Sequence, residues 1–319
     1  MAIVKPFRCI RPAADKAARV AALPYDVYNR KEACQAVEGN PLSFLNIDRA
    51  ETQFGDEVDT YDDRVYAKAR ALLDEQIASG VYVTDQGEHY YLYELTMDGR
   101  SQTGIVACCS IDDYVDGVVK KHENTREDKE IDRIRHVDAT DAHTGPIFLA
   151  YRQDGNLKSV VSAVKQGTPL YDFVSEDGIG HRVWRLDDRE QAEAVESAFA
   201  GIPATYIADG HHRAASAVKV GLRRREENPG YTGEEPFNYF LSVLFPDEEL
   251  KILPYNRVAK DLNGLDAEGF LNALSLKFQI AGMGSEAFEP SEKGTFGMFL
   301  DNGWYCLKVK PQYRSDDPV

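Results

Sequence analysis

One short stretch, residues 204–217, constrains the fold of this chain more than any other part of it. It reads Ala-Thr-Tyr-Ile-Ala-Asp-Gly-His-His-Arg-Ala-Ala-Ser-Ala. The residues Thr205–Ile207 favour an extended strand, and Asp209 is of a type that often caps a helix. Gly210 permits a tight turn, and the alanines after the two histidines favour a helix. The stretch therefore predicts a strand, a sharp turn and a helix start in direct succession.

The first turn of this predicted helix carries His211, His212 and Arg213. A helix N-terminus attracts anions through its free N–H groups and its dipole, and the arginine fork suits phosphate or carboxylate. We therefore predict that the turn at residues 209–213 binds an anion. The alternative reading is a helix start that is only solvated.

A second polar junction, residues 118–132, has the same layout. Two valines that favour a strand run directly into a polar segment. Thr125 then stands where a helix N-cap is expected, three residues before an aspartate. The helix is expected to run from Arg126 to about Asp138. The polar residues of the segment are Lys120, Lys121, His122, Glu123 and Asn124.

Together the two junctions supply the groups that phosphoryl transfer requires. That reaction needs cations and N–H groups on the phosphate, a metal ion, and a carboxylate on the attacking hydroxyl. The predicted catalytic residues are Glu123 as general base, Asp209 as a cap or a metal ligand through water, and His122. Predicted nucleotide or phosphate binders are Gly210, His211, His212, Arg213, Lys120, Lys121 and Asn124. Simpler roles stay open, in which Asp209 only caps, the lysines are solvated and His122 is a core histidine.

Several common site patterns are absent from the sequence. Without HExxH or cysteine pairs at ligand spacing, a structural zinc site is not supported. Without G-x-S-x-G there is no hydrolase elbow, and the P-loop and dinucleotide patterns are missing as well. A hard cation such as Mg²⁺ remains compatible, because it needs few protein ligands.

The amino-acid composition limits the classes of partner and the cellular location expected for this chain. The formal net charge of −16 gives no support to nucleic-acid binding, which needs a basic face. Five cysteines without a CxxC pair favour a reduced, cytoplasmic protein. No signal peptide and no apolar run of about 20 residues is seen, so no membrane association is predicted. The oligomeric state is left open.

The 319 residues suggest about two domains of mixed α/β structure. Apolar periodicity predicts a helix over 56–79, and Asp98-Gly99 and Asn302-Gly303 are typical hairpin turns. Tyr25 and Asp26 either face a pocket or pack within a loop. Further strands are expected at 81–84, 90–95, 103–111, 145–151 and 238–245, and further helices at 188–199 and 266–274.

Five motifs occur in order along the chain: Leu23-Pro-Tyr-Asp-Val, Asn40-Pro-x-Ser-Phe, Lys121-His-Glu-Asn-Thr, Thr144-Gly-Pro-Ile-Phe and Ala208-Asp-Gly-His-His-Arg. This set resembles the DUF1015 family of uncharacterised bacterial and archaeal proteins. Members of that family are longer, so the end near Asp317 suggests a short member or a missing C-terminal segment.

The Asp-Gly-His-His-Arg turn is similar to the nucleotide-binding turn of the ParB/sulfiredoxin-like superfamily, which includes free-serine kinases. The resemblance implies a ParB/sulfiredoxin-like core with a mixed sheet at 1–235 and a smaller α/β portion at 236–319. It also implies phosphate binding at Asp209–Arg213 and a glutamate base, for which Glu123 is the candidate. Sulfiredoxin chemistry would need a cysteine in the turn, and ParB-type DNA binding a basic helix-turn-helix, so neither is expected.

The predicted function is therefore a nucleotide-dependent, kinase-like phosphotransferase that acts on a small hydroxyl compound such as an amino acid. Mg²⁺ and ATP or ADP are the cofactors that this reading requires. The alternative is a non-catalytic regulatory or interaction protein that binds a nucleotide or phosphate.

Overall fold

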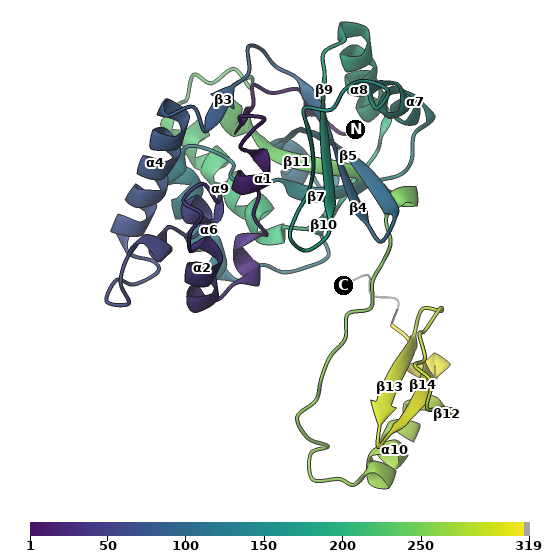
Figure 1. Cartoon of the computed structure of the whole chain (residues 1–319). Helices are drawn as coiled ribbons and strands as arrows, with labels where there is room; N and C mark the ends of the chain where they lie inside the picture. The colour runs from purple at the N-terminus through teal and green to yellow at the C-terminus, as the bar shows by residue number, and fades with distance from the viewer. Residues whose placement is uncertain (316–319) are drawn as a thin grey trace. The chain divides into compact units, whose positions relative to one another are not determined.

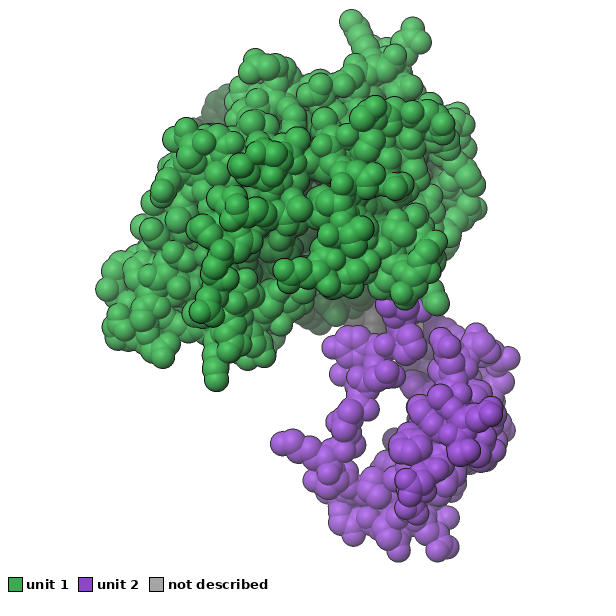
Figure 2. Space-filling model, in the orientation of Figure 1, with its two compact units in different colours: residues 1–251 green, residues 252–319 purple. Residues whose placement is uncertain are grey.

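The computed structural model describes residues 1–315, and of Asp128 it describes the backbone alone. The chain divides into two compact units, Met1–Lys251 and Ile252–Val319, which are coloured separately in Figure 2. The expectation of a missing segment beyond Asp317 lies outside the described residues.

Unit 1 is built on a mixed sheet, in which nine strands are described (Figure 1). The order is β6-β10-β7-β11-β5-β4-β9-β8, and β1 pairs with β5. The strands are β1 (Val4–Lys5), β4 (Tyr90–Met97), β5 (Arg100–Ser110), β6 (Val119–Lys120), β7 (Ile147–Tyr151), β8 (Tyr171–Val174), β9 (Gly180–Leu186), β10 (Thr205–Asp209) and β11 (Tyr239–Pro246). Two pairs, β6 with β10 and β7 with β11, are parallel. The predicted mixed α/β class is thereby confirmed, while the ParB/sulfiredoxin-like core stays a prediction.

The main hydrophobic core lies on one face of this sheet. Leu149 from β7, Phe199 from α8 and Ala214 from α9 are each fully buried in it. The helices that contribute are α5 (Ile111–Val115), α7 (Gly155–Val164), α8 (Arg189–Gly201) and α9 (His211–Glu227). Small alanines on α9 let that helix approach the strands closely, so the helix that begins at the polar turn is fixed by apolar burial.

A second hydrophobic cluster holds the N-terminal helices together. Ile47, Val65 and Tyr82 are among its buried members. The elements in this region are α1 (Ala17–Val20), η1 (Tyr25–Val27), α2 (Arg30–Val37), α3 (Leu45–Asp48), η2 (Ala50–Gln53), α4 (Asp63–Ala78), and the strand pair β2 (Ile10–Pro12) and β3 (Tyr82–Thr84).

The predicted helix at 56–79 starts later than expected, at Asp63. The side chain of Asp62 accepts a hydrogen bond from the backbone N–H of Arg64 and so caps the helix. The acidic residues before it form turns instead of a first helical turn. One further helix, α6 (Glu127–Thr140), packs against both α4 and α9 and so connects the two clusters (Figure 1).

The structure contains hairpins at both positions where the sequence predicted a turn, Asp98-Gly99 and Asn302-Gly303. Asp98 and Gly99 join β4 to β5 with φ angles of 52° and 75°, as a two-residue hairpin turn requires. The other hairpin is one residue out of register, because Asp301 and Asn302 adopt φ angles of 47° and 62° and Gly303 begins the next strand. Aspartate and asparagine enter this region more readily than other residues, so the glycine is not needed there.

Unit 2 is a small α/β unit. Its helix is α10 (Ala267–Ser275), and its sheet has the order β12 (Phe278–Gly284), β14 (Gly303–Val309), β13 (Thr295–Leu300). The division expected at residues 235/236 falls between α9 and β11, and β11 lies within the large sheet of unit 1. Residues 1–315 also contain the short helical turns η3 (Pro236–Asn238), η4 (Asp247–Glu249) and η5 (Pro311–Tyr313).

Candidate functional site

The two polar junctions meet at one end of the sheet. Strands β6 and β10 are parallel neighbours, with Thr205 opposite Val119 and Tyr206 opposite Lys120. Because parallel strands end at the same edge, the segments that follow them leave the sheet side by side. Strand β7 runs antiparallel to β10, so the residues just before Ile147 lie at this edge as well.

The turn after β10 is built on Gly210, which has a φ angle of 94°. The backbone angle favours glycine, and an added Cβ would lie 3.1 Å from the Nη2 atom of Arg213, so the guanidinium would have to shift. The N-cap of α9 is Gly210, without a side-chain cap, and not Asp209 as the sequence predicted. The carboxylate of Asp209 pairs with Arg213 instead, which removes it from the capping role.

Arg213 folds back over the turn. Its Nη2 lies 2.8 Å from Asp209 Oδ2, and its Nη1 donates to the carbonyl oxygen of Pro146 at 2.5 Å. A Cβ on Gly145 would be 3.4 Å from the same Nη1. From the sequence, Gly145 and Pro146 were expected to begin a strand and to belong to a family motif, but they were not assigned to the site. A glycine-proline pair beside a buried strand was the signal that the backbone there is approached closely.

His211 is buried between the two junctions, with 3% of its side chain exposed. Its Nε2 accepts from the backbone N–H of His122 at 3.4 Å, and its Nδ1 lies 3.4 Å from Glu123 Oε2. The His122 ring packs edge-on at 4.4 Å between centroids. Burial lowers the pKa of His211, and the neighbouring His122 acts in the same direction, whereas Glu123 opposes them. The imidazole is therefore neutral at pH 7, with its proton on Nδ1 toward Glu123.

His212 joins the turn to the start of α6. Its Nε2 accepts a hydrogen bond from the backbone N–H of Arg126 at 3.1 Å. The predicted Thr125 cap is wrong, because α6 has Arg126 at its N-cap position without a side-chain cap. The Thr125 hydroxyl donates to the buried carboxylate of Glu130, which also pairs with Lys219. A buried carboxylate needs such donors more than an exposed helix end does.

The two candidate carboxylates remain open to solvent. The side chains of Glu123 and Asp209 are 61% and 67% exposed, and both act electrostatically on His211. Lys121 lies over the ring of Tyr114, with Nζ 4.4 Å from its centroid. Lys120 and Asn124 are exposed, and within residues 1–315 no hydrogen bond or ion pair joins either side chain to the turn.

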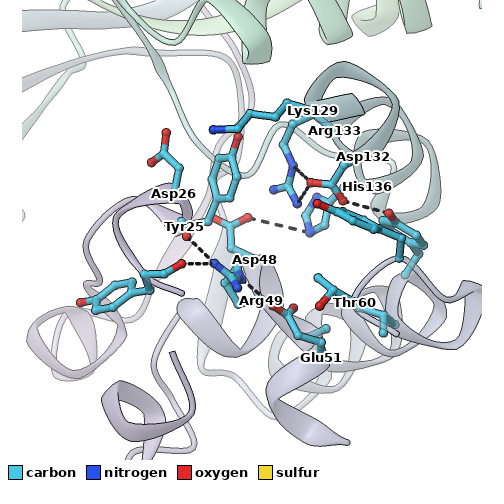
Figure 3. A pocket seen from close by; sticks show the side chains of 15 residues that line it. Tyr25, Asp26, Asp48, Arg49, Glu51, Thr60, Lys129, Asp132, Arg133 and His136 are labelled. Atoms are coloured by element: carbon cyan, nitrogen blue, oxygen red, sulfur yellow. Dashed lines mark hydrogen bonds and ion pairs between the residues drawn. The ribbon is translucent and has the colours of Figure 1, made fainter. Parts of the chain in front are cut away.

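A cavity of about 180 Å³ lies beside α6, away from this turn. Tyr25 and Asp26 both line it, in agreement with the pocket alternative of the sequence analysis (Figure 3). Its other walls come from η2, the start of α4 and the middle of α6. From the sequence, Asp48, Asp132 and Arg133 were not assigned to any site.

Within the described part of the chain, no group of three or more His, Cys, Asp or Glu side chains is arranged as a metal site. An ion carried by nucleotide phosphates needs only one or two protein carboxylates, and Glu123 and Asp209 are of the right type. Among the helices of residues 1–315, none combines the length and the apolar character needed to cross a bilayer.

Comparisons with known proteins give a family match alone. A family model described as a protein of unknown function, DUF1015, matches residues 4–319. No curated protein and no solved structure matches the chain.

Proposed function

We propose a function for this chain, which belongs to the DUF1015 family, from the meeting of its two polar junctions. It is a nucleotide-dependent phosphotransferase that acts on a small hydroxyl compound. The observation that carries the proposal is the parallel pairing of β6 with β10, which puts Glu123 beside the His211-His212-Arg213 turn.

The turn supplies the phosphate half of the site. The first hydrogen bond within α9 runs from Ala214 N to Gly210 O, so the N–H groups of the three preceding residues are not used by the helix. They belong to a helix of 17 residues, whose dipole favours an anion at this end. Arg213 adds a cation that Asp209 and Pro146 hold in place.

The segment after β6 supplies the acceptor half. Glu123 is exposed at the edge of the turn, and His211 Nδ1 faces one of its oxygens. In the proposed reaction this carboxylate takes the proton of the attacking hydroxyl. The resemblance to free-serine kinases, in which a glutamate serves as base, supports the same role.

ATP or ADP is the proposed phosphoryl donor, with Mg²⁺ as its companion ion. When bound, the ion neutralises phosphate charge. Glu123 and Asp209 are the carboxylates of this chain that would hold it, and the turn N–H groups and Arg213 would hold the phosphate.

The exposure of Glu123 favours a second function. Bulk water competes with a substrate hydroxyl for a carboxylate that is 61% exposed, whereas phosphate binding in this proposal needs the turn alone. In this alternative the protein binds a nucleotide for regulation or interaction and performs no transfer.

Thermal-shift measurements on the full chain with ATP, ADP and CTP, with and without Mg²⁺, test both functions. Stabilisation by one nucleotide, followed by its consumption when a hydroxyl amino acid is added, is the expected result. Stabilisation without consumption across an amino-acid panel favours the alternative. If no nucleotide stabilises the protein, both are wrong.

A further inference from the structure

The cavity beside α6 is lined by charged side chains from segments that lie far apart in the sequence. Figure 3 shows Tyr25 and Arg49 on one side and Asp132, Arg133 and His136 of α6 on the other. Its volume of about 180 Å³ is slightly larger than that of a dry engineered cavity that accepts benzene. A ligand of roughly six to eight non-hydrogen atoms therefore fits.

Two of its cations are already paired within the protein. Arg49 Nε lies 2.5 Å from Glu51 Oε1, and its Nη1 donates to the carbonyl oxygens of Tyr25 and Tyr28. Arg133 pairs with Asp132 at 2.8 Å, while its guanidinium lies 4.0 Å from the centre of the Tyr25 ring. These two pairs are internally neutral and need no ligand.

Asp48 is different. Its Oδ1 is buried and has no hydrogen-bond partner among the described residues. The nearest cationic candidate, His136 Nε2, is 3.9 Å away and already bonds to the carbonyl oxygen of Ile47 at 3.1 Å. Burial and the charge of Arg133 lower the pKa of His136, against the opposing effect of Asp48, so the imidazole is neutral at pH 7. A buried carboxylate oxygen without a donor is costly unless something else supplies one.

The charges left in the cavity wall indicate what that donor is. Once the two arginine pairs are set aside, the lining holds the carboxylates of Asp26 and Asp48 and the single ammonium of Lys129. The excess is negative. A small, positively charged hydrogen-bond donor would balance this negative charge. A hydrogen-bond acceptor on the same molecule could bind the ammonium of Lys129.

We propose that this cavity binds a small primary amine, with the ammonium against the carboxylate of Asp48 and a polar acceptor group toward Lys129. The molecule is of amino-acid size.

Helix α6 links the cavity to the turn at Asp209–Arg213. Arg126, whose N–H bonds to His212, and Lys129, which lines the cavity, are one helical turn apart. Burial raises the pKa of Tyr25, and the positive charges of Arg133 and Arg213 both act against that rise. A hydroxyl group carried by the same amino compound would be the phosphoryl acceptor, a role that rests on the proposed function, whereas binding of the compound does not.

L-serine and D-glycerate make a matched pair of probes, because they differ mainly in an amino group replaced by a hydroxyl. Isothermal titration of the full chain without nucleotide, at millimolar ligand, should detect L-serine or one of the related amines L-threonine and ethanolamine, and not D-glycerate. Binding of D-glycerate as tight as that of L-serine, or no binding by any of the three amines, overturns the proposal.

Two variants locate the binding. Asp48→Asn should weaken the amine at least tenfold, and the melting temperature of the free protein should stay level or rise, because an unpaired buried charge is removed. Asp63→Asn, a carboxylate with 96% of its side chain exposed and outside the cavity, is the matched control and should leave binding unchanged. Retained amine binding in Asp48→Asn contradicts the assignment.

The thermal shift caused by nucleotide is measured on the same protein preparations, so that the cavity proposal and the proposed function are tested separately. Amine binding without any nucleotide response would leave the cavity proposal standing and remove the phosphotransferase. A nucleotide response without amine binding would do the reverse.

Discussion

The turn at Asp209–Arg213 and the cavity around Asp48 differ in how their polar groups are satisfied. In the turn, His211, His212 and Arg213 each have a protein partner, yet the carboxylates beside them face solvent. In the cavity, two ion pairs are closed and one buried carboxylate oxygen is left over. The first region is held ready for a ligand that brings its own negative charge, whereas the second lacks a donor that a ligand must bring.

The largest effect is expected in the catalytic half of the turn. Glu123→Gln removes the proposed base while keeping the size of the side chain. Turnover should fall by about 10²- to 10⁴-fold, the usual contribution of a general base, and the nucleotide-induced thermal shift should persist. A coupled assay for nucleotide consumption measures this, and full turnover in the variant would remove Glu123 from the mechanism.

Stability measurements can distinguish the paired carboxylate of Glu51 from the unpaired carboxylate of Asp48. Glu51→Gln weakens the ion pair of Arg49, and both side chains are mostly buried at 2% and 13% exposed. Loss of a charged hydrogen bond of this kind should lower the free energy of unfolding by about 2 kcal/mol. Urea denaturation of this variant beside Asp48→Asn, which should lose nothing, tests the distinction. Equal losses in both would mean that Asp48 is as well paired as Glu51.

A smaller effect is expected from the backbone of the turn. Gly210→Ala places a side chain at a φ angle of 94° and near Arg213, which should cost about 1–2 kcal/mol. Gly155→Ala is the control, since a Cβ there meets no atom within 4 Å and Gly155 opens a helix. The control should be neutral or slightly stabilising, and a comparable loss in both variants would disprove the strain at Gly210.

The smallest effect concerns pH. Burial lowers the pKa of His211 below its ordinary 6.5, so the folded protein binds this proton more weakly than the unfolded chain does. The contribution of neutral His211 to the free energy of unfolding is therefore fully present above about pH 6.5. It is lost as the pH falls from there toward the pKa of His211 in the folded protein. Stability should decline by up to about 1 kcal/mol per pH unit in that window on account of this residue.

Desolvation also lowers the pKa values of the buried His136 and the half-buried His143, so the wild-type slope includes their contributions. His211→Gln should reduce the slope without abolishing it. Urea midpoints between pH 7 and pH 5 give the comparison, and identical slopes for the two proteins would exclude a neutral buried His211.

The turn could be predicted from sequence because its parts are local. Strand-forming residues, Gly210 and the alanines follow one another within one short stretch, and each acts through its own conformational preference. The mixed α/β class followed for the same reason, since apolar periodicity is read segment by segment. The capping roles of Asp209 and Thr125 failed because Arg213 and the buried Glu130, four and five residues further along, bind those side chains instead. Residue-type preferences for helix caps do not include such competing side-chain partners.

The cavity could not be predicted, because its wall is assembled from η1, α3, η2, α4 and α6. No spacing rule links Asp48 to His136. Whether Asp48 Oδ1 has a hydrogen-bond donor depends on the distance between α3 and α6 in the folded protein. Only the Tyr25-Asp26 pair gave a local indication. The pairing of β6 with β10 likewise depends on sheet order, which the strands' own sequences do not encode.

The position of helix α6 between the turn and the cavity has a consequence for ligand binding at both. The backbone N–H of its N-cap residue, Arg126, donates to His212, and its residues Lys129, Asp132, Arg133 and His136 line the cavity. A shift of this one helix therefore changes the geometry at both places. If a ligand at the turn moves α6 and alters the affinity of the cavity by some factor, the occupant of the cavity must alter affinity at the turn by the same factor. The two sites would then report on each other reciprocally.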